Sequence, residues 1–282
     1  MGGLRGCGPE GFLLRPRIDA LRYYGLMNCE TRSFSELVTA ARRLCVPGQR
    51  HLLGIAGAPG AGKSTLAARL VAELNESLTE SLDESLGELH GELHGVQLDA
   101  NPNDKPSACQ GIRFNAKLGK RAVLLPMDGY HLSNRVLEAK QLRNQKGSPA
   151  TFDATGYAEM LGRLKAQQPG DGSVYAPVYH RELEEAIAAE IEVTGDIELV
   201  ISEGNYLLAQ SEPWSQVAQF FTEIWYLELD DATRMSRLVK RHIEFGKDPE
   251  FARQWAYGSD QRNADFIAST KYLATRIITL ID

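Results

Sequence analysis

The chain has 282 residues, of which 43% are hydrophobic and 24% are charged. This is the composition of an ordinary globular protein with one large domain or two small ones. A chain of this length can bury a sizeable core without disulfide or metal cross-links, because the buried fraction of the surface rises with size. A small disulfide-rich scaffold, a collagen and a disordered chain are therefore excluded.

The net charge of −6 comes from one segment of the chain. Residues 73–94 contain seven acidic side chains and no Lys or Arg, so the remainder is close to neutral. Proteins that bind nucleic acid neutralise its phosphates with an excess of basic residues, which the chain as a whole lacks. We therefore expect no nucleic acid among its partners, while a local basic patch stays compatible with the sequence.

The four cysteines lie far apart, at Cys7, Cys29, Cys45 and Cys109. Without a C-x-x-C pair, free thiols in a reducing, cytoplasmic compartment are expected. No run approaches the ~18 apolar residues of a membrane span, so no membrane partner is expected. Residues 1–26 carry several Arg but no signal-peptide pattern, and they leave organelle targeting open. Met27 is an alternative start to Met1.

The first predicted helix runs from Ser33 to Leu44. Ser33 stands in the N-cap position with Glu36 three residues later, which is the pattern of a capping box. Apolar runs typical of buried parallel strands follow at Leu52–Gly57, Ala122–Met127, Leu199–Ser202, Ile224–Leu229 and Ile277–Ile281. Since helix-length stretches separate these runs, we predict a three-layer α/β fold, with a parallel sheet and helices on both faces.

A low-complexity acidic insertion separates the first two predicted strands, at about residues 75–119. Its first half repeats every four residues around Glu-Ser-Leu and Glu-Leu-His-Gly. The leucines could continue the apolar stripe of the preceding helix. A solvated insertion is favoured, because glycines 87, 91 and 95 would each cost about 1 kcal/mol inside a helix. His90 and His94 belong to this repeat and do not form the H-E-x-x-H pattern of a zinc helix.

A glycine-rich segment directly after the first predicted strand fits the pattern G-x-x-x-x-G-K-[ST]. The predicted nucleotide-binding residues are Gly57, Ala58, Pro59, Gly60, Ala61, Gly62, Lys63, Ser64 and Thr65. In such a loop, backbone N–H groups and the start of the next helix point at phosphate oxygens. Lys63 then reaches the β- and γ-phosphates, and Ser64 offers its hydroxyl to Mg²⁺. The segment predicts nucleoside triphosphate binding in preference to a turn without a ligand.

Two acidic residues follow later predicted strands and reach the same edge of the sheet. Asp128 ends the second strand and Glu203 ends the third. Ligands of α/β proteins bind at this carboxyl edge, so Asp128 can accept the proton of an attacking hydroxyl or hold Mg²⁺ through water. The alternatives are an Asx turn for Asp128 and a solvated strand end for Glu203.

Several segments together resemble a known group, the P-loop small-molecule kinases of the phosphoribulokinase, uridine kinase and pantothenate kinase superfamily. The segments are Gly57–Thr65, MDGYHL at 127–132, KGSPATFD at 146–153, APVYHRELEE at 176–185, SEGNYLL at 202–208, and Leu229–Gly246. Within the superfamily the chain looks most similar to the nucleoside/nucleotide kinase-like, or fructose-transport kinase-like, subgroup. The resemblance covers roughly residues 33–282 outside the insertion.

The resemblance implies a phosphotransferase that uses ATP and Mg²⁺. It implies Asp128 as the general base, Ser64 and Glu203 around Mg²⁺, and Arg237 and Arg241 as lid cations over the transferred phosphoryl group. The spacing agrees, because Arg234, Arg237 and Arg241 share one helix face. The alternative is a solvated basic face paired with acids such as Glu244.

The acceptor side is less well defined by the sequence. Uridine kinases carry a ribose-binding Asp at the position that Ala150 takes in this chain, so uridine is not favoured. The candidates for substrate contact, chosen by position, are Tyr130, His131, Phe152, Asp153, Tyr179, His180 and Arg181. For each aromatic ring, packing in the core or at the rim is an equal alternative.

The sequence is compatible with two functions. The favoured one is an ATP-dependent kinase that phosphorylates a hydroxyl of a small metabolite such as a nucleoside, a sugar or a pantothenate-like compound. The alternative is a nucleotide-dependent switch without a small-molecule acceptor. The expected organisation is an N-terminal extension at 1–32 and one kinase domain at 33–282 that contains the insertion; a homodimer is left open.

Overall fold

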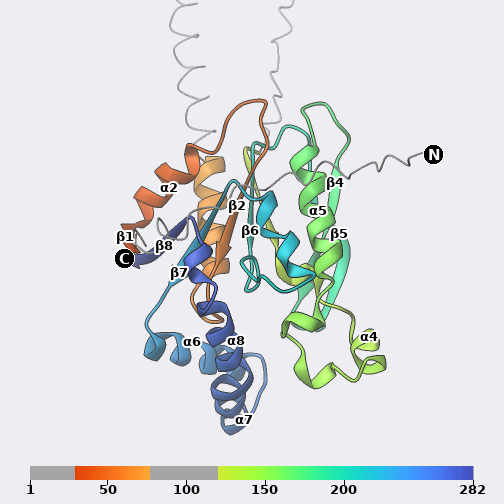
Figure 1. Cartoon of the computed structure of the whole chain (residues 1–282), viewed down its shortest axis with the longest axis vertical. Coiled ribbons are helices and arrows are strands. Elements are labelled where there is room, and N and C mark those ends of the chain that lie inside the picture. The colour runs from red at the N-terminus through yellow and green to blue at the C-terminus, as the bar shows by residue number, and fades with distance from the viewer. Residues whose placement is uncertain (1–28, 77–119, 282) are drawn as a thin grey trace, which may run out of the picture.

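The structure, a computed structural model, describes residues 29–76 and 120–281. These residues form a six-stranded sheet in the order β1-β8-β7-β2-β6-β3, in which all neighbouring strands are parallel (Figure 1). They also form a separate antiparallel hairpin, β4 and β5. The strands are β1 Cys29–Ser33, β2 His51–Ala56, β3 Ala122–Pro126, β4 Val174–His180, β5 Glu185–Val193, β6 Leu199–Glu203, β7 Glu223–Glu228 and β8 Arg276–Ile281.

Helices lie on both faces of the sheet and form a lid beyond its carboxyl edge (Figure 1). They are α2 Phe34–Arg42, the helix of residues 63–76, α4 Asn134–Ala139, α5 Ala154–Ala166, α6 Asp231–Glu244, α7 Pro249–Trp255 and α8 Gln261–Ala268. A π-helical turn, Ala256–Asp260, joins α7 to α8. The predicted three-layer α/β fold, with a parallel sheet, helices on both faces and a lid, is confirmed.

The sheet divides the hydrophobic core into two layers because successive strand residues face opposite sides. In β2, Leu52 contributes to the layer that also contains α5, whereas Leu53 and Ile55 contribute to the layer that contains α2 and residues 63–76. The helices contribute buried apolar residues at helical spacing, such as Leu66 and Leu70. Burial on both faces explains why the central strands are continuous apolar runs in the sequence.

The predicted helix at Ser33–Leu44 is α2, and its capping box is confirmed. The Glu36 backbone N–H donates to the Ser33 hydroxyl at 3.4 Å, and the Ser33 N–H donates to the Glu36 carboxylate at 2.9 Å. The structure also pairs β1 with β8, so residues 29–32 of the expected extension belong to the sheet. This strand was missed because its sequence, C-E-T-R-S, is polar, as befits an edge strand.

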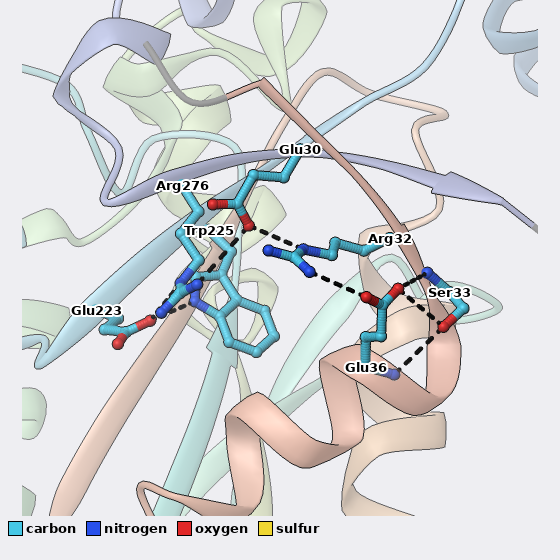
Figure 2. A network of polar contacts seen from close by, with 7 residues as sticks. All are labelled: Glu30, Arg32, Ser33, Glu36, Glu223, Trp225 and Arg276. Atoms are coloured by element: carbon cyan, nitrogen blue, oxygen red, sulfur yellow. Dashed lines mark hydrogen bonds and ion pairs between the residues drawn. The ribbon is translucent and has the colours of Figure 1, made fainter. Parts of the chain in front are cut away.

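A polar network fixes β1 to the sheet (Figure 2). The Arg276 guanidinium lies 3.1 Å from the Glu223 carboxylate and 3.7 Å from that of Glu30. Arg32 connects Glu30, at 3.0 Å, to Glu36 of the capping box, at 2.9 Å. These charges therefore join β1, α2, β7 and β8 where an apolar edge would invite pairing with another chain.

Most of the expected extension and insertion lies outside the described residues. This includes His90, His94, Cys7 and Cys109; the described Cys29 and Cys45 are free thiols. Among the described helices, none is long and apolar enough to cross a membrane.

The sequence places the beginning of the insertion at about residue 75, but the side chain of Asn75 takes part in the fold. The Asn75 amide donates to the Ala122 carbonyl at 3.0 Å and accepts from the N–H groups of Arg121 and Ala122 at 2.9 and 3.0 Å. Asn75 therefore ties the end of the helix that follows the glycine-rich loop to the beginning of β3, the strand that leads to Asp128.

We predict that Asn75→Ala lowers the free energy of unfolding by about 2 kcal/mol, because it leaves backbone groups at the start of β3 without their partner. Urea denaturation measures the change, with Glu76→Ala at the neighbouring exposed position as the control. Equal stability of the two variants would contradict the assigned role of Asn75.

Candidate functional site

The glycine-rich loop lies between the end of β2 and the helix that begins at Lys63. Gly57, Gly60 and Gly62 all have positive φ angles, of 148°, 85° and 96°. At Gly60, a Cβ atom would also stand 2.9 Å from the Arg234 carbonyl oxygen, so a larger residue would push the loop away from α6. Glycine is required here both for backbone conformation and for the close approach of the lid.

Three polar side chains meet behind this loop. Lys63 is 7% exposed and its ammonium donates to the Ala58 carbonyl at 3.1 Å; burial lowers its pKa to about 8. The Ser64 hydroxyl donates to the Glu203 carboxylate at 2.8 Å. Burial, with the nearby Asp128 carboxylate, raises the pKa of Glu203. The loop therefore holds a cation and a carboxyl group that are both largely removed from water.

Asp128 lies in a short 3₁₀ turn, Met127–Tyr130, directly after β3. Its carboxylate forms an ion pair with Arg181 of the hairpin end at 3.1 Å, and both side chains are partly exposed. The turn packs closely on β4, because a Cβ on Gly129 would stand 2.4 Å from the Pro177 carbonyl oxygen. Gly129 thus lets the hairpin bring Arg181 to the carboxylate.

The strands behind Asp128 and Glu203 are joined by a buried polar link. The Tyr157 hydroxyl of α5 lies 2.6 Å from the Ser202 hydroxyl, which donates to the Leu125 carbonyl. Because Ser202 precedes Glu203 and Leu125 lies near the end of β3, the link fixes the strand ends that carry the two acids.

An aromatic group lies next to Asp128. The His131 ring lies 3.9 Å from Phe152 and 4.5 Å from Tyr179, measured between ring centroids. The Nδ1 atom of His131 donates to the Asp128 carbonyl oxygen at 2.8 Å. Burial lowers the pKa of His131, which favours the neutral ring. The group presents a hydrophobic wall to the space in front of Asp128.

The three lid arginines of α6 take different positions. Arg234 is 2% exposed; it donates to Asp231 and Gln261 within the lid and, at 3.5 Å, to the Pro59 carbonyl of the glycine-rich loop. Arg241 faces the cleft, and burial lowers the pKa of its guanidinium. Arg237 is exposed, and its Nη1 atom lies 3.7 Å from where a Cβ on Gly62 would stand.

One cleft of about 260 Å³ collects most of the predicted site residues. It is lined by Pro59, Gly60, Lys63, Ser64, Asp128, His131, Phe152, Tyr179, Arg181, Glu203 and Arg241. The cleft extends from the glycine-rich loop, past Asp128, to the aromatic group. The phosphate side and the acceptor side expected from the sequence therefore share one space.

Three predicted substrate contacts lie elsewhere. Tyr130 is 8% exposed and packs on Tyr157 with ring centroids 5.0 Å apart, so it belongs to the core. Asp153 caps α5 by accepting from the Gly156 N–H at 2.8 Å. His180 points away on the alternating hairpin strand and pairs with Glu182 and Glu190, which raise its pKa. The position of a residue in a sequence motif does not indicate in which direction its side chain points.

The cleft also contains residues that the sequence analysis did not assign to the site. They are Arg143, Lys146, Gly147, Glu184, Gly204, Asn205, His242, Phe245, Lys247, Trp255, Asp260 and Asn263. Lys146 and Glu184 stood inside the quoted motifs, and Phe245 is one helical turn beyond Arg241. The residues from the end of the lid had no comparable signal, because they reach the cleft only through the packing of α7, the π-helical turn and α8.

The oxygen-rich corner at Ser64, Asp128 and Glu203 fits a hard divalent cation. No group of three or more His, Cys, Asp or Glu side chains in residues 29–76 and 120–281 has the arrangement of a metal site. A hydroxyl and two carboxylates are nevertheless the donors that Mg²⁺ takes when phosphate and water complete its shell. Burial and the nearby Asp128 carboxylate raise the pKa of Glu203, so a cation placed beside the two carboxylates would stabilise their charged forms.

The burial of Lys63 leads to a prediction about stability. Since its pKa falls from 10.5 to about 8 on folding, desolvation costs stability fully below pH 8 and not at all above pH 10.5. Lys63→Met should therefore raise the free energy of unfolding of the nucleotide-free protein at pH 7, on the order of 2–3 kcal/mol. Urea denaturation should show the gain shrinking between pH 8 and 10.5.

The matched control is Lys240→Met, because Lys240 is 78% exposed. It should change stability by less than about 0.5 kcal/mol. A Lys63→Met variant less stable than the parent at pH 7 would contradict the interpretation.

Two curated relatives with similar sequences carry the names of kinases. The chain is 28% identical over 222 residues to a candidate uridine kinase of Schizosaccharomyces pombe, covering 77% of each protein. It is 30% identical over 152 residues to the ATP-dependent kinase-like protein notR' of Aspergillus versicolor, covering 51% of this chain and 88% of that protein. No model of a protein family matches the chain.

Two solved structures are also similar to the chain. A candidate fructose transport system kinase from Silicibacter sp. TM1040 is 29% identical, with a TM-score of 0.64 over 88% of this chain and 98% of that one. YFH7 from Saccharomyces cerevisiae, at 18% identity and a TM-score of 0.69, supports the fold alone. The chain therefore belongs to the uridine kinase-like family of ATP-dependent P-loop kinases.

Proposed function

We propose that the protein transfers the γ-phosphate of ATP to a hydroxyl group of a small metabolite. The observation that carries the proposal is the shared cleft, in which Lys63 and Ser64 lie at one end and Asp128 faces the aromatic group at the other. A nucleotide switch needs a phosphate site and a group that orients water. The part of the cleft beside the carboxylate, walled by His131, Phe152 and Tyr179, suits an organic acceptor.

In the proposed reaction, the acceptor oxygen forms a bond to the γ-phosphorus while the bond from that phosphorus to the β-γ bridging oxygen breaks. The hydroxyl proton passes to the Asp128 carboxylate, and ADP leaves with the bridging oxygen. Lys63, with Arg241 from the lid, offsets the negative charge on the phosphoryl oxygens. His131 and Tyr179 exclude water from the acceptor side.

Ser64, Glu203 and Asp128 would hold Mg²⁺, either directly or through water. When bound, the ion supplies positive charge to the phosphate oxygens and orients them. Glu203 is held ready for this role by the hydroxyl of Ser64 and by its place at the end of β6, in register with Ile55 of β2.

The proposal is tested by measuring ADP release from ATP with a panel of hydroxyl compounds, including nucleosides, sugars and hydroxy acids. A kinase releases ADP in proportion to added acceptor, and the phosphorylated product is found by mass spectrometry. ADP release that is independent of every acceptor would support the nucleotide switch instead.

We predict that Asp128→Asn lowers acceptor-dependent turnover by about 10²–10⁴, the usual contribution of a positioned general base. The amide keeps the size of the side chain but cannot take the proton. ATP affinity should change little, because the loop supplies most phosphate contacts. Steady-state kinetics and nucleotide binding are measured side by side.

The matched control is Asp196→Asn, an exposed position in the loop before β6, at the opposite edge of the sheet. Recovery of Asp128→Asn turnover by added Mg²⁺ would assign Asp128 to the metal rather than to the proton. Unchanged turnover would remove Asp128 from both roles.

A further inference from the structure

The far end of the cleft carries a cation that the proposed phosphate chemistry does not use. Lys146 lies in the loop between α4 and α5, beside the end of the β4–β5 hairpin, and lines the cleft with Arg143, Tyr179 and Glu184. These four residues are named the Lys146 corner. None of them belongs to the glycine-rich loop or to the lid.

Positive charge exceeds negative charge in the Lys146 corner. The Glu184 carboxylate is taken by Arg143, at 2.7 Å. The Lys146 ammonium donates to the Asn134 side-chain oxygen at 2.6 Å and to the Glu184 backbone carbonyl. It also lies 5.2 Å from the centroid of the Tyr179 ring. Within the described residues, Lys146 has neutral partners and no carboxylate at ion-pair distance.

The Lys146 ammonium is also partly removed from water. Burial is the largest cause that lowers the pKa of Lys146, and the neighbouring Arg143 lowers it further, against Glu184 and Glu185. A partly desolvated cation beside a second cation is stabilised by any anion that enters the cleft. Glu184 and Glu185 lie nearby, but no carboxylate of the described residues is at ion-pair distance from the Lys146 ammonium, so an anion that enters the cleft would be its first direct counter-charge.

Short contacts connect the corner to the reacting end of the cleft. Lys146 lies over Tyr179, Tyr179 stacks on His131, and His131 donates to the Asp128 backbone. A small molecule lying along this aromatic wall can place one end at Lys146 and a hydroxyl at Asp128. The phosphates of ATP have separate cations in Lys63, at the end of the glycine-rich loop, and Arg241 of α6.

We propose that the acceptor is an anionic hydroxyl compound, a carboxylate or a phosphate monoester, whose negative group binds the ammonium of Lys146. The inference rests on the proposed kinase function and narrows its substrate class. It makes Lys146 a determinant of specificity: a neutral sugar or nucleoside leaves the cation unpaired and binds less well.

Binding is tested first, without turnover. Calorimetry measures glycerol, glycerate and glycerol 3-phosphate, which share a three-carbon hydroxylated skeleton, against protein saturated with a non-hydrolysable ATP analogue that occupies the phosphate end. We expect glycerate or glycerol 3-phosphate to bind better than glycerol, and Lys146→Gln to weaken that binding about 10- to 100-fold. The stronger of the two anions distinguishes a carboxylate from a phosphate.

Three variants separate charge from structure. Lys146→Gln keeps a donor for Asn134 and for the Glu184 carbonyl but removes the charge. Lys146→Arg keeps the charge and should retain the preference for anions. Lys140→Gln, at an exposed position at the end of α4, is the control that should behave as the parent. Thermal unfolding checks that the variants fold.

Turnover of the same three compounds, extended to ribose, ribonate and ribose 5-phosphate, is measured next. In Lys146→Gln, KM for the anionic acceptor should rise while KM for ATP stays constant. Equal binding of neutral and anionic compounds, or anion binding that Lys146→Gln leaves intact, overturns the inference. Acceptor turnover that favours neutral compounds also overturns it, and leaves the kinase proposal standing. Lys146-dependent anion binding with no turnover of any compound counts against the kinase proposal alone.

Discussion

The constraint on which the rest of the structure depends is the burial of opposite charges at the carboxyl edge of a parallel sheet. Lys63 and Glu203 are both under a tenth exposed, and burial lowers the pKa of Lys63 and raises that of Glu203. They come together because β2 and β6 are direct neighbours, so the loop after one strand and the acid at the end of the other meet. The same geometry adds Asp128 from β3, the next strand along. The site is therefore a consequence of strand order.

The lid is attached to this edge by packing rather than by charge alone. Arg234 of α6 donates to Gln261 of α8 and to the Pro59 carbonyl of the glycine-rich loop, and the Gly60 backbone closes against the same turn of α6. Beyond this anchor, the lid has a small hydrophobic cluster of Met235, Leu238 and Ala256, with several exposed rings. A segment with so few buried apolar contacts has low local stability. The charges of a bound nucleotide would therefore add proportionally more to the lid than to the sheet.

The parts of the molecule that could be predicted from sequence are those in which local pattern and tertiary environment agree. The central strands are buried on both faces and read as apolar runs, and the glycine-rich loop needs positive φ angles at fixed positions. Strand β1 is polar because it lies at the edge of the sheet, and strand β5 of the hairpin is largely exposed, so neither strand reads as a continuous apolar run. His180 was chosen and Lys146 was passed over for one reason: the direction of a side chain on a peripheral element depends on contacts distant in sequence.

The two halves of the cleft therefore differ in how freely their residues can be substituted. The phosphate half is built from strand ends whose positions the core fixes. The acceptor half is built from the hairpin and the loop between α4 and α5, which the Arg143–Glu184 pair joins. The hydrogen bond from Tyr206 to the Gly147 carbonyl ties the same loop to the segment after β6. Substitutions in these peripheral elements can change the charge and shape of the acceptor half without disturbing the sheet. Similarity in the phosphate half therefore supports the same phosphate donor in related proteins. The identity of the acceptor, in contrast, must be argued from the side chains of each protein.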